Sequence, residues 1–385
     1  MNEKWITKNL HELLEVQNGY AFSSKNFNIL KGIPLIRIRD LKNGYHTETQ
    51  YIGEYDRKYL VKKDDLLIGM DGEFGCYKWL GDDALLNQRV CKLHSFSREI
   101  YPNFLLYGLN SYLKKIEERT GYTTVKHLSS RQIHGIQFSF PSFEEQKRIV
   151  SILDESFEAI DIAKANTERN LQNARALFES YLNDIFSQKG EGWHETTLGK
   201  IGVIQTGSTP KTSDKNNYGN YIPFIKPANF NKDGTLNYAD YGLSMDGLAL
   251  ARLIKAGSVL MVCIGTIGKC GYCDRDVTTN QQINSFTPDD GIDYKFIYFQ
   301  LLTRKFQHQV WLKSGQTTLP IINKSKWSNL RVSLPSQLHN QRQIVKNLEK
   351  MSQETLKLEA IYQKKLSALE EIKKSLLHQA FNGEL

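Results

Sequence analysis

Short apolar runs, separated by Gly, Asn, Asp and Pro, recur along most of the chain and predict short strands. The strand candidates are IPLIRI (33–38), DLLIGM (65–70), QFSFP (137–141), IPFIK (222–226), SVLMVCIG (258–265) and LRVSLP (330–335). Two longer segments, residues 101–120 and 293–310, space their apolar residues as a helix does, and each predicts one amphipathic helix. Strands and helices mixed in this way indicate α+β domains.

Two further segments have apolar residues in steps of three and four, which predicts long helices with one packing seam each. The first seam is Ile149, Leu153, Ser156, Ile160, Ala163, Thr167, Leu171, Ala174, Phe178, Tyr181 and Ile185. The second is Ile344, Leu348, Met351, Thr355, Leu358, Tyr362, Leu366, Leu369, Ile372 and Leu376. Each seam contains two successive steps of four, a stutter, at Thr167–Leu171 and at Tyr362–Leu366. The shared stutter predicts that the helices pair with each other, although two separate surface helices remain an alternative.

Helix-end signals bound both segments. Ser142 and Glu145 have the spacing of a capping box at the start of the first. Gly190 and Gly383 stand just past the two helical patterns, where glycine commonly ends a helix.

The whole chain is one unit of about 190 residues written twice. WITKNLHELLEVQNG at Trp5–Gly19 aligns with WHETTLGKIGVIQTG at Trp193–Gly207, and the offset between the halves grows from 188 to 195 along the chain. Other matched pairs are Asn87-Gln88 with Asn280-Gln281, GYTTV (121–125) with GQTTL (315–319), and PSFEEQKRIV (141–150) with PSQLHNQRQIV (335–345). The repeat predicts two similar α+β domains, residues 1–140 and 191–334, each followed by a spacer helix, residues 141–190 and 335–385.

Chain connectivity predicts how the helices pair. The second globular domain begins where the first helix ends and ends where the second helix begins. If that domain is compact, the two helices are antiparallel, each roughly 60 Å long at 1.5 Å per residue. The expected architecture has approximate two-fold symmetry, with two heads held apart by a two-helix spacer.

Composition narrows the class of protein. Fifty Lys and Arg against 42 Asp and Glu give a formal net charge of +8, which is compatible with a polyanionic partner without requiring one. The N-terminal residues include Glu3, Lys8 and Glu12 where a signal peptide has an apolar core, and no apolar run approaches a membrane span. Five cysteines, an odd number, favour reduced thiols and a cytoplasmic location.

Enzyme motifs are close to absent from the sequence. CIGTIGKC (263–270) has Cys where a phosphate-binding loop needs its first Gly and its Ser or Thr, so a strand-to-turn loop is favoured. Cys263, Cys270 and Cys273 lack the second pair of a zinc site, and buried thiols are favoured. Asp289 and Asp293 in PDDGIDYK are too close in sequence to form the paired acidic core of a nuclease. The chain also has no Pro-Pro pair, so it lacks the Asp-Pro-Pro-Tyr type of methyltransferase tetrapeptide.

The remaining candidate chemistry is binding. Arg and Lys suit guanine and phosphate, whereas Asn and Gln suit adenine. The expected DNA-contacting residues in the first half are Tyr20, Lys25, Arg37, Arg39, Lys42, Thr123, Thr124 and Lys126. Those in the second half are Lys211, Lys215, Asn217, Tyr218, Lys226, Asn229, Thr317 and Thr318. Solvated loops have a similar composition, and the repeated Gly-x-Thr-Thr could equally be an ordinary turn.

The order of elements, the two PS…Q…IV helices and the ending LLHQAFNGEL (376–385) together resemble the DNA-specificity subunit of a type I restriction–modification system. This resemblance covers the entire chain. It implies that each head is a target-recognition domain for one half of a split double-stranded DNA site. It also implies that the helices dock two modification subunits, and that restriction subunits join the complex.

The resemblance further implies a non-catalytic chain without its own cofactor. S-adenosylmethionine is expected on the modification subunits, and ATP and Mg²⁺ on the restriction subunits. QNGYAFSSKNF in the first half stands where the second half has QTGSTPKTSD, so the two half-sites should differ. The alternative is a coiled-coil-spaced adaptor whose two heads bind proteins.

Overall fold

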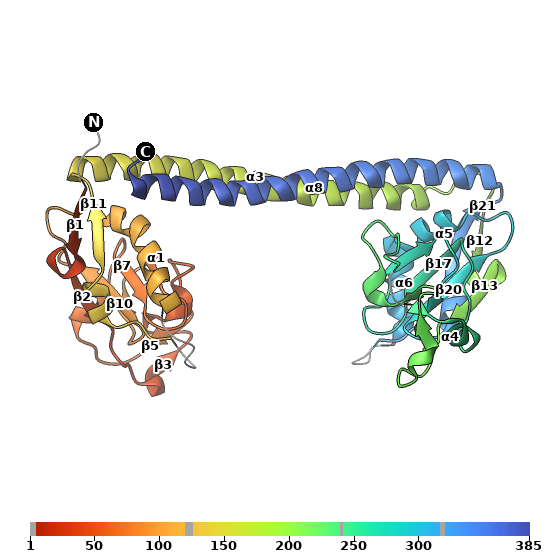
Figure 1. Cartoon of the computed structure of the whole chain (residues 1–385), viewed down its shortest axis with the longest axis horizontal. Helices are drawn as coiled ribbons and strands as arrows, with labels where there is room; N and C mark the ends of the chain where they lie inside the picture. Colours follow the sequence, from red (N-terminus) through yellow and green to blue (C-terminus); the bar gives the residue numbers. More distant parts are fainter. Residues whose placement is uncertain (1–4, 120–125, 239–241, 316–319) are drawn as a thin grey trace. The chain divides into compact units, whose positions relative to one another are not determined.

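A computed structural model describes residues 5–119, 126–238, 242–315 and 320–385 of the chain. Contacts divide the chain into two compact units, one formed by Met1–Ala165 with Ser367–Leu385 and the other by Asn166–Leu366. Each unit contains one globular head and parts of two long helices, α3 (Phe143–Ser187) and α8 (Leu338–Asn382) (Figure 1). Among the described helices, none combines the length and the apolar character that a membrane span requires.

Head one is built on an antiparallel four-stranded sheet. Its strands, in spatial order, are β2 (Glu15–Asn18), β10 (Val90–His94), β7 (Leu66–Gly69) and β8 (Gly75–Lys78). A second sheet contains β3 (Phe27–Asn28), β5 (Gln50–Tyr51), β4 (Ile33–Ile36), β9 (Ala84–Leu86) and β6 (Leu60–Val61), with β4 and β9 parallel. The first and last strands of the head, β1 (Ile6–Asn9) and β11 (Gln137–Phe140), pair antiparallel, and the helices are α1 (Pro102–Arg119) and α2 (Ser130–His134).

Head two repeats this plan. Its main sheet has the order β13 (Gly202–Thr206), β20 (Ile283–Pro288), β17 (Ser258–Val262) and β18 (Cys270–Cys273). The other pairs are β12 (Trp193–Thr197) with β21 (Arg331–Pro335), β15 (Phe224–Ile225) with β19 (Thr278–Thr279), and β14 (Tyr218–Gly219) with β16 (Gly242–Leu243). Its helices are α4 (Met245–Ala249), α5 (Tyr294–Leu301), α6 (Arg304–Ser314) and α7 (Lys324–Ser328). The predicted repeat of two similar α+β domains is confirmed by this shared strand order.

The expectation of one amphipathic helix per head is wrong for head two. Residues 293–310 fall into α5 and α6, and the hydroxyl of Thr303 caps the second by accepting a hydrogen bond from the Phe306 N–H at 3.3 Å. Residues 293 and 315 of the second half align with residues 101 and 121 of the first. The second half has two more residues between these positions than the first. The break accommodates these extra residues, and Thr supplies a cap where continued helix would favour an apolar residue.

Three strand predictions extend too far. The segment 258–265 forms a strand only over Ser258–Val262. The segment 33–38 forms a strand only to Ile36, and 222–226 only over Phe224–Ile225. In both heads the chain then enters a single 3-10 turn, and this turn carries the basic residues discussed below.

The antiparallel pairing of α3 and α8 is confirmed in the first unit, and the two helices are also paired in the second. In the first unit, Asp161 and Lys164 of α3 form ion pairs with Lys373 and Glu370 of α8, so the partner number falls as the α3 number rises. In the second unit, Arg175 of α3 pairs with Glu359 of α8 at 2.9 Å. Most of the predicted seam residues are at least partly buried, and Thr167 and Thr355 are fully so.

The seam prediction is wrong at two positions of α8. Leu358 and Ile372 are 39% and 48% exposed, and they lie outside the packed stripe. The predicted stop at Gly383 is confirmed, because this residue follows α8 directly with φ of +73°. Gly190 does not occupy that position in α3, which already ends at Ser187.

The repeated tryptophans join each head to a helix. In the first unit, Trp5 and Phe381 of α8 lie against Phe104, with ring centroids 6.0 and 4.9 Å away. In the second unit, Trp193 and Phe186 of α3 lie against Phe296, at 5.7 and 5.1 Å. The same three-ring cluster is thus completed by the end of a different helix in each unit. Packing of three aromatic rings, some buried and some partly buried, makes this a strong junction between head and helix.

The repeated glutamine of the PS…Q…IV segments is a structural residue. Gln146 is fully buried, accepts a hydrogen bond from the Tyr101 N–H and donates to the carbonyls of Glu99 and Pro141. Gln341 is 1% exposed, accepts from the Asp293 N–H and donates to the carbonyl of Pro335, with a longer contact to that of Gly291.

Each amide therefore satisfies backbone groups of two segments that would otherwise be buried without partners. It ties the first turn of the long helix to the loop that precedes α1 or α5.

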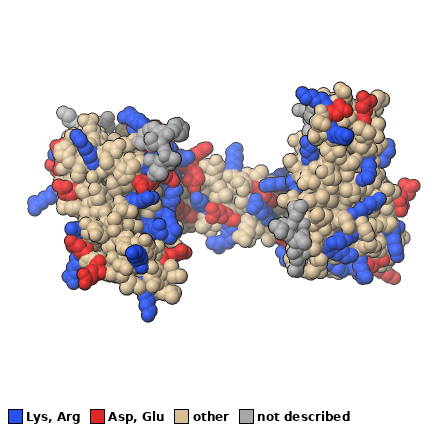
Figure 2. Space-filling view, turned by 90° about the horizontal axis from the view of Figure 1, so that it is seen from below, with Lys and Arg blue, Asp and Glu red and all other residues tan. Residues whose placement is uncertain are grey.

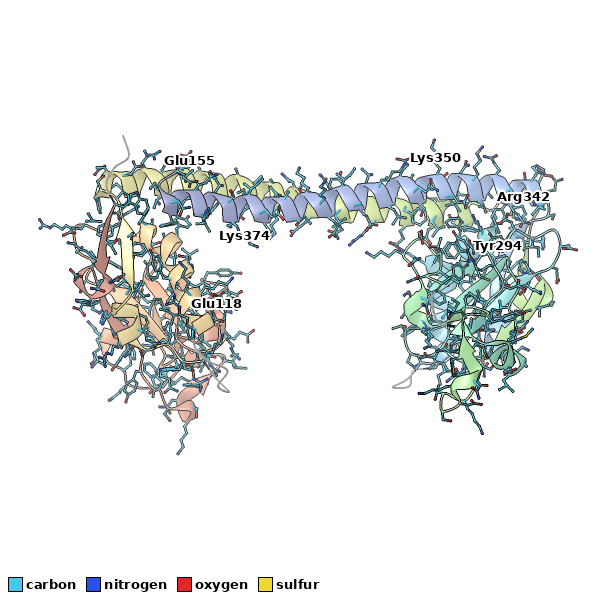
Figure 3. All side chains as sticks on the ribbon, viewed as in Figure 1. Glu118, Glu155, Tyr294, Arg342, Lys350 and Lys374 are labelled. Atoms are coloured by element: carbon cyan, nitrogen blue, oxygen red, sulfur yellow. The ribbon has the colours of Figure 1, made fainter. Side chains whose placement is uncertain are left out.

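In unit two, Lys350 projects from the side of α8 away from the head, whereas Tyr294 lies beneath that helix (Figure 3).

Candidate nucleic-acid interface

A 3-10 turn after β4 holds two arginines at the surface of head one. In this turn, η3 (Ile38–Asp40), the Asp40 carboxylate accepts a hydrogen bond from the Arg37 N–H at 2.9 Å. Asp40 is only 8% exposed, and its other oxygen lies 3.8 Å from Nε of Arg39. The buried acid thus closes the turn, and the guanidinium groups of Arg37 and Arg39 are left at the protein surface.

The two arginines line adjoining pockets. One pocket, of about 390 Å³, is bordered by Arg37 and Arg39 on η3 and by Asn87, Gln88 and Arg89 from the connection after β9. A second, of about 480 Å³, is lined by both arginines together with Phe27, Asn28, Ile29 and Thr49. We call the joined surface the arginine groove. No Asp or Glu is among the residues that line these two pockets.

The far wall of the arginine groove depends on a close backbone approach. A Cβ atom on Gly19 would lie 2.0 Å from the carbonyl oxygen of Asn87, so only glycine fits there. Gly207 has the same relation to Asn280 in head two, at 2.1 Å. The Gln-x-Gly and Asn-Gln motifs that recur in both halves therefore meet in space, and the sequence repeat at these positions reflects packing.

Arg89 is held in place by an acid outside the arginine groove. Asp71 is 3.1 Å from Nε of Arg89 and 2.6 Å from Nδ1 of His127. Its side chain is 15% exposed, whereas that of Arg89 is 63% exposed. This arrangement orients the guanidinium while leaving its terminal N–H groups for a ligand. Sequence reasoning missed Arg89, although it directly follows the repeated Asn-Gln pair.

An aromatic surface lies near the arginine groove. Tyr20 is half exposed, and its ring centroid is 5.1 Å from those of Phe22 and Tyr59. Lys25 is exposed in the following turn, η2 (Ser24–Asn26). Exposed aromatic and basic side chains of this kind suit nucleic acid.

The equivalent turn in head two keeps its cap and lacks the arginines. In η7 (Pro227–Asn229), Oδ1 of Asn229 accepts a hydrogen bond from the Lys226 N–H at 2.8 Å, as Asp40 does from Arg37. Ala228 stands where head one has Arg39. Lys226 is exposed, and its ammonium lies 5.7 Å from the ring centroid of Phe224. Asn229 was expected to contact DNA, but its carbonyl oxygen is committed to closing this turn.

A second expected contact is not available in this structure. Asn217 is 3% exposed, and its amide donates to the carbonyl of Lys211 at 3.2 Å. The Tyr218 hydroxyl donates to the carbonyl of Pro210, and both interactions shape the loop before η6 (Lys215–Asn217). Lys211 and Lys215 are exposed on this loop. Asn217 is therefore a residue that supports the loop and does not present its amide to a ligand.

The other predicted residues are divided between ion pairs and undescribed positions. Lys42 pairs with Glu73 at 2.6 Å, and this carboxylate raises the pKa of Lys42. Lys126 lies 3.6 Å from Glu117. Thr123, Thr124, Thr317 and Thr318 lie outside the described residues. Figure 2 shows lysine and arginine side chains spread over the face of each head that lies away from the helices, with acidic side chains between them.

The apparent enzyme motifs have structural explanations. CIGTIGKC spans the turn between β17 and β18, and Asp293 caps α5 by accepting hydrogen bonds from the N–H groups of Lys295 and Phe296. All five cysteines are buried, and burial raises the pKa of Cys270 to about 12 and that of Cys273 to about 11. Within the described ranges, no three His, Cys, Asp or Glu side chains are grouped so that they could hold a metal ion.

Comparison with known proteins identifies the family. The family described as "Type I restriction modification DNA specificity domain" matches residues 2–172 and 190–370. The chain belongs to this family. The specificity subunit of the type I restriction enzyme EcoBI from Escherichia coli is 29% identical, over 100% of this chain and 87% of that protein.

Two solved structures share the fold. A chain from a study of complex assembly and conformational transition of the type I restriction–modification system aligns with a TM-score of 0.76 at 20% identity, covering 99% of this chain and 98% of that one. The HsdS subunit from Thermoanaerobacter tengcongensis aligns with a TM-score of 0.60 at 17% identity, covering 99% and 97%. The specificity-domain family thus accounts for both heads and both long helices.

Proposed function

We propose that this chain is the non-catalytic specificity subunit of a type I restriction–modification complex, and that each head reads one half of a bipartite double-stranded DNA site. The observation that carries the proposal is the match of the specificity-domain family to both halves of the chain. Two further observations support it. The main sheets of the two heads have the same strand order, and the turns that follow β4 and β15 carry different side chains.

The target is asymmetric in this proposal. Heads that kept the same side chains in both turns would read the same bases, whereas here Arg37 and Arg39 correspond to Lys226 and Ala228. Arginine offers a planar fork of donors that lysine and alanine cannot reproduce. The two half-sites therefore differ in sequence.

The long helices dock two modification subunits. Aliphatic side chains stay exposed on them, namely Ile162 and Leu177 of α3 and Leu358, Ile361 and Ile372 of α8. Burial of exposed aliphatic side chains is a general source of affinity between proteins. In this assembly the modification subunits carry S-adenosylmethionine, and restriction subunits use ATP and Mg²⁺, so the present chain needs no cofactor of its own.

The decisive experiment maps methylated bases in cells that express this chain together with a modification subunit. The expected result is one bipartite, non-palindromic motif that disappears when the chain is omitted. The purified chain alone, given S-adenosylmethionine and DNA, is expected to transfer no methyl group. Methyl transfer that persists through repurification would contradict the non-catalytic role.

A protein-binding adaptor would behave differently. The specificity subunit should bind random duplex at low salt and lose affinity steeply as salt rises, because Lys and Arg displace counterions from phosphates. An adaptor with protein-binding heads would show neither property and would leave no methylated motif in the host.

A further inference from the structure

The Arg37 side chain is a donor group with no partner in head one. It is half-buried beside η3, and its guanidinium makes no hydrogen bond or ion pair with any residue in the described part of the chain. Arginine has five N–H donors and no acceptor. None of these nitrogens is among the buried side-chain atoms without a partner, so the donors reach the surface and are available to an acceptor-rich ligand.

Arg39 extends this donor surface. Its side chain is 60% exposed, and its contact to Asp40 is long, at 3.8 Å. Both arginines line the same two pockets, and no acid lines either of them, although Arg39 also borders a smaller pocket with Asp71 and Glu73. Gln88 and Arg89 contribute further polar groups from the opposite wall, and Arg89 is already oriented by Asp71.

We infer that head one reads guanine through Arg37 and Arg39 in the arginine groove, while the corresponding turn of head two does not. The inference rests on the proposed function and adds the base class and the residues that determine it. Guanine presents two acceptors, O6 and N7, on its major-groove edge, and the arginine fork matches both. Arg89 serves as a phosphate contact in this arrangement, because its charge is shared with Asp71 and its side chain is the most exposed of the three.

Phosphate alone explains the geometry less well. A phosphate contact needs only an exposed cation, such as Lys226 in head two, and does not need two guanidinium groups on one turn. In head one the buried Asp40 fixes both arginines to one short turn, and this is the type of pre-organisation that base recognition requires. Head two keeps the cap but not the arginine pair, so the turn is a common scaffold and the side chains on it differ.

The test is the double variant Arg37→Lys/Arg39→Ala, which gives head one the side chains of head two. It removes one positive charge, and Arg98→Ala is the matched control, because it removes one exposed arginine from the same head outside the arginine groove. Each variant is expressed with the modification subunit, and methylated motifs are mapped. Competition binding to duplexes that carry each base at every position of the motif measures the discrimination.

The wild type should show a guanine in one half-site. In the double variant, the binding preference for that guanine over the other bases should fall by about 5- to 150-fold. This is the range for one bidentate contact. The other half-site should remain unchanged, which also shows that the variant folds and assembles. The single variant Arg37→Lys should give a smaller loss at the same base, and Arg98→Ala should leave the motif intact.

Two results would overturn the inference while leaving the specificity role in place. One is a wild-type motif in which the half-site altered by the double variant contains no guanine. The other is a double variant that weakens binding to all sequences alike, which would make the arginines phosphate contacts only. Absence of any bipartite motif for the wild type would instead contradict the proposed function.

Discussion

Head one and head two have the same sheet order and the same capped turn after their first parallel strand, but different side chains on that turn. Asp40 and Asn229 accept the same backbone hydrogen bond, and Gly19 and Gly207 make the same close approach. Arg37 and Arg39 are replaced by Lys226 and Ala228. The comparison separates the residues that build the head from those that differ on its surface, and both kinds lie within a few positions of each other.

The strongest test of this separation exchanges a whole head. Replacement of residues 191–334 by the corresponding segment of a relative should change one half of the methylated motif completely and leave the other half unchanged, because contacts within each head position its binding surface. Mapping of methylated bases in cells gives the result. A change in both halves, from a complex that still assembles, would show that the heads do not act as modules.

The next largest effect is expected at the two matched glycines. Gly19→Ala and Gly207→Ala would each place a Cβ atom about 2 Å from a backbone carbonyl oxygen, so the backbone must shift. We expect a loss of about 2–4 kcal/mol in the free energy of unfolding of the affected head. Urea denaturation measures it, with Gly190→Ala as the control, because its nearest neighbour atom is 3.7 Å away. Equal stability of Gly207→Ala and Gly190→Ala would disprove the packing role.

The buried glutamines should have similar effects in the two units. Gln146→Leu and Gln341→Leu each leave buried backbone groups without partners, and a loss of about 2–3 kcal/mol in the free energy of unfolding follows. Gln343→Leu on the exposed surface of α8 is the matched control and should change stability by less than about 0.5 kcal/mol. If Gln341→Leu is as stable as this control, the repeated glutamine has a role other than tying the helix to the head.

Two neighbouring residues in head two should separate folding from binding. Asn217→Ala removes a buried amide and should cost about 1–2 kcal/mol of stability without altering the motif. Lys215→Ala removes an exposed cation, so it should leave the stability unchanged. The slope of the logarithm of the DNA-binding constant against the logarithm of salt concentration should become shallower by about one. Thermal melts and salt titrations distinguish the two, and a changed motif in Asn217→Ala would show that this amide does read a base.

The smallest effect concerns the buried thiols, of which head one has two and head two has three. Burial raises the pKa of Cys91 and Cys270 to about 12, so neither thiol ionises in the folded head at neutral pH. The unfolded chain ionises its thiols near pH 9, so this contribution to stability is present below that pH and is lost as pH rises toward 12. Native protein should react slowly with a thiol reagent at pH 8, and rapid reaction of all five thiols would contradict their burial.

The sequence alone was sufficient to predict the repeat, the two long helices, one strand of each main sheet and the family. These features depend on local periodicity and on motifs that recur at a nearly constant offset. It also proposed Arg37, Arg39 and Lys226 as DNA contacts, since these lie among glycines and short strands, and this stays a prediction. It did not reveal that 293–310 breaks into α5 and α6, because a single Thr cap and two extra residues outweigh an otherwise continuous helical pattern.

Only the tertiary structure decided which polar side chains are committed to the fold. Asn217, Asn229 and Asp40 are as polar as their neighbours in the sequence, yet Asn217 and Asp40 are buried, and Asp40 and Asn229 close backbone turns. Arg89 gains its orientation from Asp71, which lies 18 positions earlier and on a different segment. Hydrogen-bond partners and burial are set by residues that meet through the fold, so residue type predicts what a side chain is able to bind, and its tertiary surroundings decide whether it is available to do so.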